Sequence, residues 1–151
     1  MQIIRDDLRG PDIAALLQAH LDDFAPHSPP ESRHALDLEE LRQPDVYFYT
    51  VWEDDDLLGC GAFKRLDATH AELKSMRTDP RHLRRGVARG LLTHLIESAK
   101  AEGLTRLSLE TGSPAHFAPA RKLYATFGFE ICGPFGDYVE DPYSVFMTRS
   151  L

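Results

Sequence analysis

The sequence is poor in cysteine, it has fewer basic than acidic residues, and it has no long hydrophobic run. Only Cys60 and Cys132 occur in 151 residues, and both stand among apolar residues, which is typical of reduced core thiols in a cytoplasmic protein. No apolar run approaches the roughly 20 residues of a membrane helix, and the first residues lack the zones of a signal peptide. A cytoplasmic protein without membrane contact is therefore expected.

The charge balance argues against a nucleic-acid partner. The formal net charge is −7, from 17 basic and 24 acidic residues, whereas nucleic-acid binding requires a basic stripe that neutralises several phosphates. Four arginines nonetheless gather in one short segment: Arg81, Arg84, Arg85 and Arg89. A compact basic patch on an acidic chain fits one small polyanion better than a polymer.

Several catalytic signatures are also missing. Residues 84–89 lack both the Gly-Lys-Ser/Thr ending of a P-loop and the three-glycine dinucleotide signature. Ser113 follows an expected strand without the Gly-x-Ser-x-Gly elbow of a hydrolase. His20, His27 and His34 straddle a proline-rich loop, so they form no helical metal pair, and no metal is expected. Nucleotide hydrolysis and hydride transfer are thereby excluded.

One domain covering residues 1–151 is expected, because no repeat or linker divides a chain of a length that buries one sizeable core. Apolar periodicity predicts strands over residues 2–5, 46–52, 57–63, 71–78, 104–111, 129–132 and 144–149. It predicts helices over residues 11–21 and 32–42, from Val87 to near Gly103, and around Pro119 to Gly128. The strand, helix and strand between residues 71 and 111 favour a parallel crossover within a mixed α/β sheet.

The turn at residues 84–89 is suited to binding phosphate. A helix start offers backbone N–H groups without intrahelical partners, together with the positive end of the helix dipole. Gly86 and Ala88 leave room for ligand oxygens to reach the backbone, and the arginines of the turn can add charge-assisted hydrogen bonds. The sequence therefore predicts a phosphorylated cofactor at this turn.

Three segments share one order and spacing with a known family: Leu73-Lys74-Ser75-Met76-Arg77-Thr78, Leu83-Arg84-Arg85-Gly86-Val87-Ala88-Arg89, and Ala120-Arg121-Lys122-Leu123-Tyr124-Ala125-Thr126-Phe127-Gly128-Phe129. With these segments and this order of expected strands and helices, the chain resembles the GNAT family of N-acetyltransferases over essentially its whole length. The sequence departs from the family pattern at Leu83, where Gln or Arg is usual. The resemblance implies a mostly antiparallel central sheet, splayed at its middle strands and flanked by helices, with acetyl-CoA as co-substrate.

The resemblance also implies which residues hold acetyl-CoA. The backbone of Met76, Arg77 and Thr78 would bond the pantetheine arm as an added strand, and an N–H near Met76 would polarise the thioester carbonyl. The Met76 side chain itself is expected to fill the core. The remaining implied cofactor contacts are Arg84, Arg85, Gly86, Val87, Ala88, Arg89, Ser113 and Tyr124.

The implied reaction is direct attack by an amine of a small molecule or peptide on the thioester. Tyr124 stands where the family places a tyrosine near the cofactor sulfur, and it is the candidate general acid. Glu72 and Glu110 are candidate general bases, because a carboxylate near the amine could take its proton directly or through water. Strand alternation would place Glu72 on one face with Lys74 and Met76.

Two other activities stay open, because no residue identifies the base uniquely. The chain could be a non-catalytic acetyl-CoA sensor, or it could acetylate a hydroxyl. His116 is a further candidate for the base. The acceptor is expected to meet the loop Asp22–Glu31, the start of the next helix and the loop Gly133–Tyr143. Pairing of sheet edges would allow a homodimer.

Overall fold

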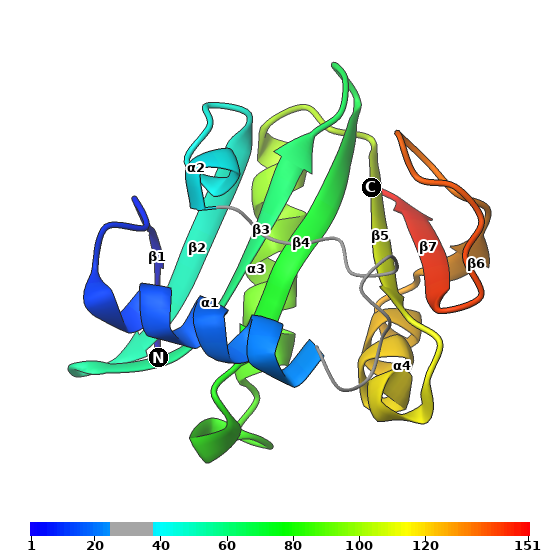
Figure 1. Ribbon diagram of the computed structural model, residues 1–151. Helices are drawn as coiled ribbons and strands as arrows, with labels where there is room; N and C mark the ends of the chain where they lie inside the picture. The colour runs from blue at the N-terminus through cyan, green and yellow to red at the C-terminus, as the bar shows by residue number, and fades with distance from the viewer. Residues whose placement is uncertain (25–37) are drawn as a thin grey trace.

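A seven-stranded sheet forms the centre of the protein in a computed structural model that describes residues 1–24 and 38–151 (Figure 1). Its strands are β1 (Gln2–Arg5), β2 (Val46–Glu53), β3 (Asp56–Arg65), β4 (His70–Thr78), β5 (Arg106–Gly112), β6 (Glu130–Cys132) and β7 (Ser144–Ser150). They lie in the order β1-β2-β3-β4-β5-β7-β6. Only the β4–β5 pair is parallel. The expected mixed, mostly antiparallel sheet is confirmed.

Helices cover both faces of this sheet (Figure 1). They are α1 (Pro11–Phe24), α2 (Leu38–Leu41), α3 (Val87–Ala101) and α4 (Ala118–Thr126), with short 3-10 helices η2 (Pro80–His82) and η3 (Ala115–Phe117). Leu91 and Leu95 of α3 are buried in the apolar cluster on one face, and Ile13 and Leu17 of α1 in a second cluster on the other. The helix expected over residues 32–42 is described only from Leu38, because residues 25–37 lie outside the described part.

The parallel strands β4 and β5 separate halfway along their length. Their pairing runs from His70 opposite Arg106 to Leu73 opposite Leu109, and ends there. Beyond this point, residues 74–78 of β4 pair only with β3, and residues 110–112 of β5 pair only with β7. The expected splay of the middle strands is therefore confirmed, and among the described strands it leaves one backbone edge of β4 without a partner.

A β-bulge at Ser75 accompanies this separation. Lys74 pairs with Ala62 and Arg77 pairs with Cys60. Between these two pairs, β4 therefore contains one more residue than β3. Ser75 takes the left-handed conformation, with φ +59°. A bulge bends the strand that contains it. The bulge thus turns the end of β4 away from β5.

The same bulge contradicts the expectation that Glu72, Lys74 and Met76 share one strand face. Met76 packs against the α3-side cluster. Its sulfur lies directly over Gly61 of β3, where a Cβ atom would be only 2.5 Å from it. Glu72 is on the opposite face, since its neighbour Leu73 belongs to the α3-side cluster. The extra residue shifts the alternation by one position. The Met76 side chain fills the core, as expected.

The two thiols differ in their surroundings. Cys60 is fully buried, and desolvation raises the pKa of its thiol to about 12. Cys132 is free but only half-buried. The expectation of two core thiols is therefore wrong for Cys132, because β6 is a short edge strand whose central Ile131 is 78% exposed.

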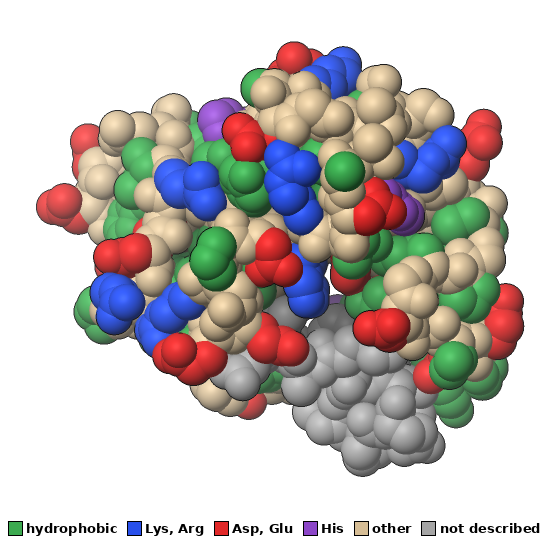
Figure 2. Space-filling model, turned by 90° about the horizontal axis from the view of Figure 1, so that it is seen from above, with side chains coloured by type: hydrophobic (Ala, Val, Ile, Leu, Met, Phe, Trp, Pro, Cys, Tyr) green, Lys and Arg blue, Asp and Glu red, His purple; other side chains and the backbone are tan. Residues whose placement is uncertain are grey.

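Charges of both signs are interspersed on the surface seen in Figure 2. Lys and Arg side chains alternate with Asp and Glu across this face, and no extended field of one sign forms on it. Among the helices of the described residues, none has the length and apolar character needed to cross a membrane.

Candidate active site

The turn before α3 forms a hollow of about 310 Å³ at a helix start. Gly86 is the N-cap of α3 in the left-handed conformation, with φ +80°, and the first intrahelical bond joins Gly90 N to Gly86 O at 3.0 Å. The amides of residues 87–89 precede that bond, so they lack intrahelical partners, and the first turn carries no acidic residue. The residues that line the hollow are Thr78, Leu83, Arg84, Gly86, Val87, Ala88 and Arg89. This is an anion-binding geometry.

The arginines of this segment are not equivalent. Arg84 and Arg89 line the hollow. Arg85 instead contacts Glu53 Oε1 through its Nη2 at 2.8 Å and His82 Nδ1 through its Nη1 at 2.8 Å. Arg81 forms an ion pair with Asp79. The structure therefore brings Arg84 and Arg89 to the predicted phosphate site, and it directs Arg85 toward the β2–β3 hairpin.

A second hollow, of about 120 Å³, occupies the gap between the separated ends of β4 and β5. Its lining residues are His20, Leu73, Lys74, Ser75, Met76, Leu109, Glu110, Thr111, Phe117, Ala120 and Tyr124. Phe117 reaches the gap because its ring packs directly on Gly112, where a side chain would collide with it. The gap thus combines an unpaired strand edge with an aromatic wall from η3 and α4.

Tyr124 is the buried aromatic residue of this wall. It is 8% exposed, and its ring lies edge-on to Phe129 with centroids 5.9 Å apart. Within the described part of the chain, its hydroxyl has no hydrogen-bond partner. Burial raises the pKa of Tyr124 above its ordinary value, so the hydroxyl stays neutral. It is suited to donate a hydrogen bond inside the gap.

Two carboxylates lie on the α1 side of β4 and β5. Glu110 lines the gap, and its Oε2 accepts a hydrogen bond from Ser144 Oγ at 2.6 Å. Glu72 is only 6% exposed, and its Oε2 accepts a hydrogen bond from the Tyr138 hydroxyl at 2.5 Å. Glu72 pairs with Ser108, two residues before Glu110, so both carboxylates face the same side. The sequence identified both carboxylates but missed both hydroxyl donors.

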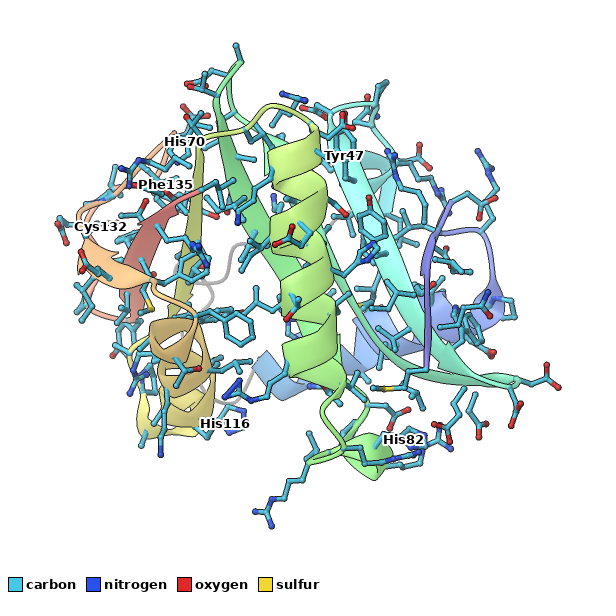
Figure 3. The ribbon with its side chains drawn as sticks, turned by 180° about the vertical axis from the view of Figure 1, so that it is seen from behind. Tyr47, His70, His82, His116, Cys132 and Phe135 are labelled. Carbon is cyan, nitrogen blue, oxygen red and sulfur yellow. The ribbon has the colours of Figure 1, made fainter. Side chains whose placement is uncertain are left out.

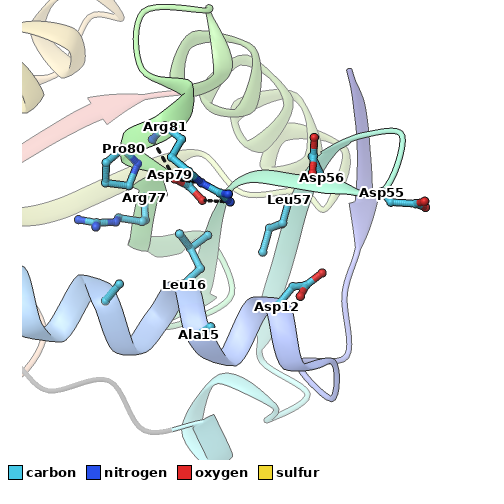
Figure 4. Close-up of a pocket in the computed structure, with 11 residues that line it drawn as sticks. Asp12, Ala15, Leu16, Asp55, Asp56, Leu57, Arg77, Asp79, Pro80 and Arg81 are labelled. Atoms are coloured by element: carbon cyan, nitrogen blue, oxygen red, sulfur yellow. Dashed lines mark hydrogen bonds and ion pairs between the residues drawn. The ribbon is translucent and has the colours of Figure 1, made fainter.

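Three other candidate residues lie away from this gap. Arg77 lines a separate hollow of about 440 Å³ between α1, the β2–β3 turn and the end of β4 (Figure 4). Ser113 Oγ donates to Pro142 O at 2.6 Å, which fastens the end of β5 to the following loop. His116 is exposed on η3 beside α4, at the end of the sheet opposite His70 (Figure 3). Cofactor contacts by the Arg77 backbone and by Ser113 remain predictions.

Metal ligands do not converge in the parts of the chain that the structure covers. No group of three or more His, Cys, Asp or Glu side chains there could hold an ion. Of the evenly spaced histidines, only His20 belongs to the described residues, and it lines the gap. His27 and His34 lie outside them.

A polar row continues from the carboxylates across the sheet. His70 Nε2 and Ser108 Oγ lie 2.7 Å apart, and Ser108 Oγ lies 2.8 Å from Thr148 Oγ1. Burial, helped by the Arg106 charge, lowers the pKa of the half-buried His70, and the charges of Asp67 and Glu72 oppose this. His70 is therefore held neutral in the folded protein.

This lowered pKa predicts a stability loss in mild acid. The unfolded chain binds a proton at His70 near its ordinary pKa of roughly 6.5, before the folded protein does, so protonation favours unfolding. The contribution of neutral His70 to the free energy of unfolding is complete above that pH, and it is lost as the pH falls toward the pKa of His70 in the folded protein. We expect His70→Gln to lose less stability than wild type between about pH 7.5 and about pH 5. Urea unfolding at both pH values measures this, and identical losses would contradict it.

Comparison with known proteins agrees with this geometry. The family model described as "Acetyltransferase (GNAT) family" matches residues 13–129. The protein named "Uncharacterized N-acetyltransferase YsnE" from Bacillus subtilis (strain 168) is 57% identical over 151 residues, covering 100% of both chains. A crystal structure described as a putative acyl-CoA N-acyltransferase, from Klebsiella pneumoniae, is 26% identical, with a TM-score of 0.80, 99% of this chain covered and 97% of the other.

A second solved structure bears on the co-substrate. A GNAT family acetyltransferase from Elizabethkingia anophelis, determined with acetyl-CoA bound, superposes with a TM-score of 0.73 at 18% identity, covering 99% of this chain and 97% of the other. At this identity the likeness concerns the fold. The family model and the closely similar Bacillus relative concern the sequence itself. The chain belongs to the GNAT family of acetyltransferases.

Proposed function

We propose that the protein is an acetyl-CoA-dependent N-acetyltransferase, which transfers acetyl to a primary amine of a small molecule or peptide by direct attack in a ternary complex. One observation carries the proposal: the open edge of β4 joins an anion-binding helix start to a gap that contains Tyr124 and Glu110. The phosphates of acetyl-CoA would lie at the helix start, its pantetheine arm along the edge of β4, and its thioester in the gap. We also propose a cytoplasmic location, in keeping with two free cysteines.

The residues present fit acetyl-CoA. The free amides at the start of α3, with Arg84 and Arg89, would hold the diphosphate. The backbone of residues 76–78, unpaired on the β5 side, would bond the pantetheine amides as a neighbouring strand does. When bound, acetyl-CoA supplies an acyl group activated as a thioester. A backbone N–H near Met76 would stabilise the charge that develops on the carbonyl oxygen.

The two carboxylates would prepare the acceptor. An amine attacks a thioester only in its neutral form, so a protonated amine must first lose a proton. We propose that Glu110, which lines the gap, binds the amine, and that Glu72 takes the proton directly or through one water. Lys74 lines the same gap. Acceptors that carry an anionic group beside the amine therefore belong in any substrate screen.

Tyr124 would stabilise the departing thiolate. Its raised pKa makes complete proton transfer to sulfur less favourable, so hydrogen bonding is its proposed contribution. A hydrogen bond to a charged group contributes about 1.5–3 kcal/mol, so Tyr124→Phe should lower kcat by roughly 10- to 100-fold. Affinity for CoA should change much less. Steady-state rates and calorimetric titration with CoA measure the two effects, and an unchanged kcat would remove Tyr124 from the reaction.

A panel of acceptors tests the proposed function directly. Thiol release from acetyl-CoA would be followed with amino acids, polyamines, aminoglycosides and peptide N-termini, and the acetylated product identified by mass spectrometry. Transfer to an amine above the uncatalysed rate supports the proposal and excludes a purely binding role. Transfer to hydroxyl compounds alone would assign an O-acetyltransferase instead. Binding of acetyl-CoA without transfer to any acceptor would favour a sensor.

A further inference from the structure

We infer that Tyr138 is a positioning residue for Glu72, through which the loop between β6 and β7 sets the orientation of the proposed base. The loop covers residues 133–143, and Tyr138 lies 66 positions from Glu72 in the chain. The inference rests on the proposed function, since it concerns the carboxylate assigned there to proton removal. It adds a residue that lines neither the gap nor the hollow at the cofactor turn.

The contact between Tyr138 and Glu72 is direct. The Tyr138 hydroxyl donates to Glu72 Oε2 at 2.5 Å, and it is the one hydrogen-bond donor to this side chain within the described residues. Glu72 is only 6% exposed, so few water molecules reach its side chain to replace a lost donor. With Oε2 held by the tyrosine, Oε1 is the oxygen that would accept the proton in the proposed reaction.

Aromatic packing fixes the position of the Tyr138 hydroxyl. The Tyr138 ring lies 5.2 Å from Phe135 and 5.4 Å from Phe146, measured between centroids. Phe146 is a buried residue of β7 and also packs edge-on against Phe135. Phe135 in turn lies 5.9 Å from the ring of His70, two residues before Glu72 (Figure 3). The loop therefore packs onto the same part of the sheet that carries the base.

The end of this loop is fastened to β5 as well. Ser113 N donates to Tyr143 O at 3.0 Å, and Ser113 Oγ donates to Pro142 O. One residue further, Ser144 donates to Glu110. Both carboxylates of the proposed site thus receive a hydroxyl donor from one short stretch of chain. This arrangement couples the orientation of the base to the conformation of the loop.

The charges around this pair favour a neutral tyrosine that donates to an ionised carboxylate. Burial, the charge and hydrogen bond of Glu72, and the charge of Glu110 all raise the pKa of Tyr138. Among the described residues, the nearby charged or titratable groups are Lys64 opposite Glu72 on β3, His70 and Lys74 on β4, Arg106 on β5, and His20 of α1 at the gap. Tyr138→Phe would withdraw this hydrogen bond from the Glu72 carboxylate, and a hydrogen bond of this kind favours the charged form of a carboxyl group.

Tyr138→Phe tests the inference in the enzyme, because it keeps the ring and removes only the donor. We expect kcat to fall about tenfold, since general-base catalysis depends on geometry, and CoA affinity to stay unchanged. The acid limb of the kcat/KM profile should move to higher pH, because a base that binds protons more readily is inactive over a wider acid range. Tyr47→Phe, which removes a tyrosine–glutamate hydrogen bond to Glu102 outside both hollows, should change none of these.

A double variant separates positioning from a general effect on the fold. If Tyr138 acts through Glu72, adding Tyr138→Phe to Glu72→Gln should lower kcat little further. Multiplicative losses in the double variant would overturn the inference.

An NMR titration tests the contact without any turnover. Carbon-13 signals of glutamate side-chain carboxyl groups would be followed against pH, with the Glu72 signal assigned by its loss in Glu72→Gln. The Glu72 midpoint should rise in Tyr138→Phe and stay in place in Tyr47→Phe. If Tyr138→Phe does not fold, fluorotyrosine at position 138 replaces it: this stronger donor should lower the midpoint, and an unmoved midpoint would overturn the inference.

The outcomes distinguish this inference from the proposed function. Wild-type protein that acetylates no acceptor would defeat the proposed function, and the NMR midpoint would still decide whether Tyr138 controls Glu72. Wild-type protein that acetylates an amine, while Tyr138→Phe keeps the rate, the acid limb and the Glu72 midpoint, would overturn the inference alone.

Discussion

Gly86→Glu should weaken CoA binding by roughly 100-fold or more. Gly86 is the left-handed N-cap of α3, with φ +80°, and a side chain there costs about 1–2 kcal/mol in backbone strain. The added carboxylate would also stand beside the free amides, where the proposed diphosphate binds, and repel it. Backbone strain lowers the stability of the free and the CoA-bound protein alike. The loss of affinity therefore comes from the repulsion between the new carboxylate and the diphosphate, and a 100-fold loss corresponds to roughly 2.7 kcal/mol. Isothermal titration calorimetry with CoA measures the loss.

Matched variants separate ligand binding from backbone strain. Gly103 has φ +82° beyond the other end of the same helix, so Gly103→Glu introduces a similar strain far from the hollow. We expect it to lower stability and leave CoA affinity near wild type. Arg84→Ala should weaken binding, and Arg85→Ala should do so much less, because Arg85 is bound to Glu53. Equal losses for both glycine variants would remove the turn from the binding site.

Glu72→Gln should reduce kcat by roughly 10²- to 10⁴-fold, the usual contribution of a general base. The substitution keeps the size of the side chain and an oxygen that can accept the Tyr138 hydroxyl, so the fold and CoA affinity should persist. Rates measured with the best amine acceptor, over a range of pH, test this. The residual rate of Glu72→Gln should no longer show the acid limb of the wild-type pH profile.

Glu110→Gln should behave differently, because Glu110 is assigned to binding the amine. Its main effect should be a higher KM for the acceptor, with a smaller loss of kcat. Glu97→Gln, on the outer surface of α3, serves as the control and should match wild type. If Glu110→Gln abolishes kcat while Glu72→Gln leaves it intact, the roles of the two carboxylates are the reverse of those proposed.

The parts of the fold predicted from sequence depend on local signals. The apolar stripe of α3, the glycine at its start and the strand on either side are all encoded within short segments, so the turn and the parallel crossover could be predicted. The splay of β4 from β5 was expected only from the family resemblance. The Ser75 bulge could not be predicted from alternation, because a bulge breaks the very periodicity on which that prediction relies.

The side-chain contacts of the site depend on tertiary packing, which explains why several escaped prediction. Arg85 looks equivalent to Arg84 in the sequence, yet Glu53, 32 positions away, binds it. The hydroxyl of Ser113, a predicted cofactor contact, donates to a carbonyl of the β6–β7 loop, and the sequence gives no sign of this partner. Tyr138 lies in a loop that the sequence assigned only to acceptor contacts. Its hydrogen bond to Glu72 depends on the packing of this loop against β4, which no local sequence pattern encodes.

A crystal structure with CoA bound tests the central claim most directly. The account predicts diphosphate density on the backbone amides of Val87, Ala88 and Arg89, a pantetheine arm along the open edge of β4, and the sulfur beside the Tyr124 hydroxyl. Coenzyme bound elsewhere, with the gap between β4 and β5 closed by side chains, would contradict it.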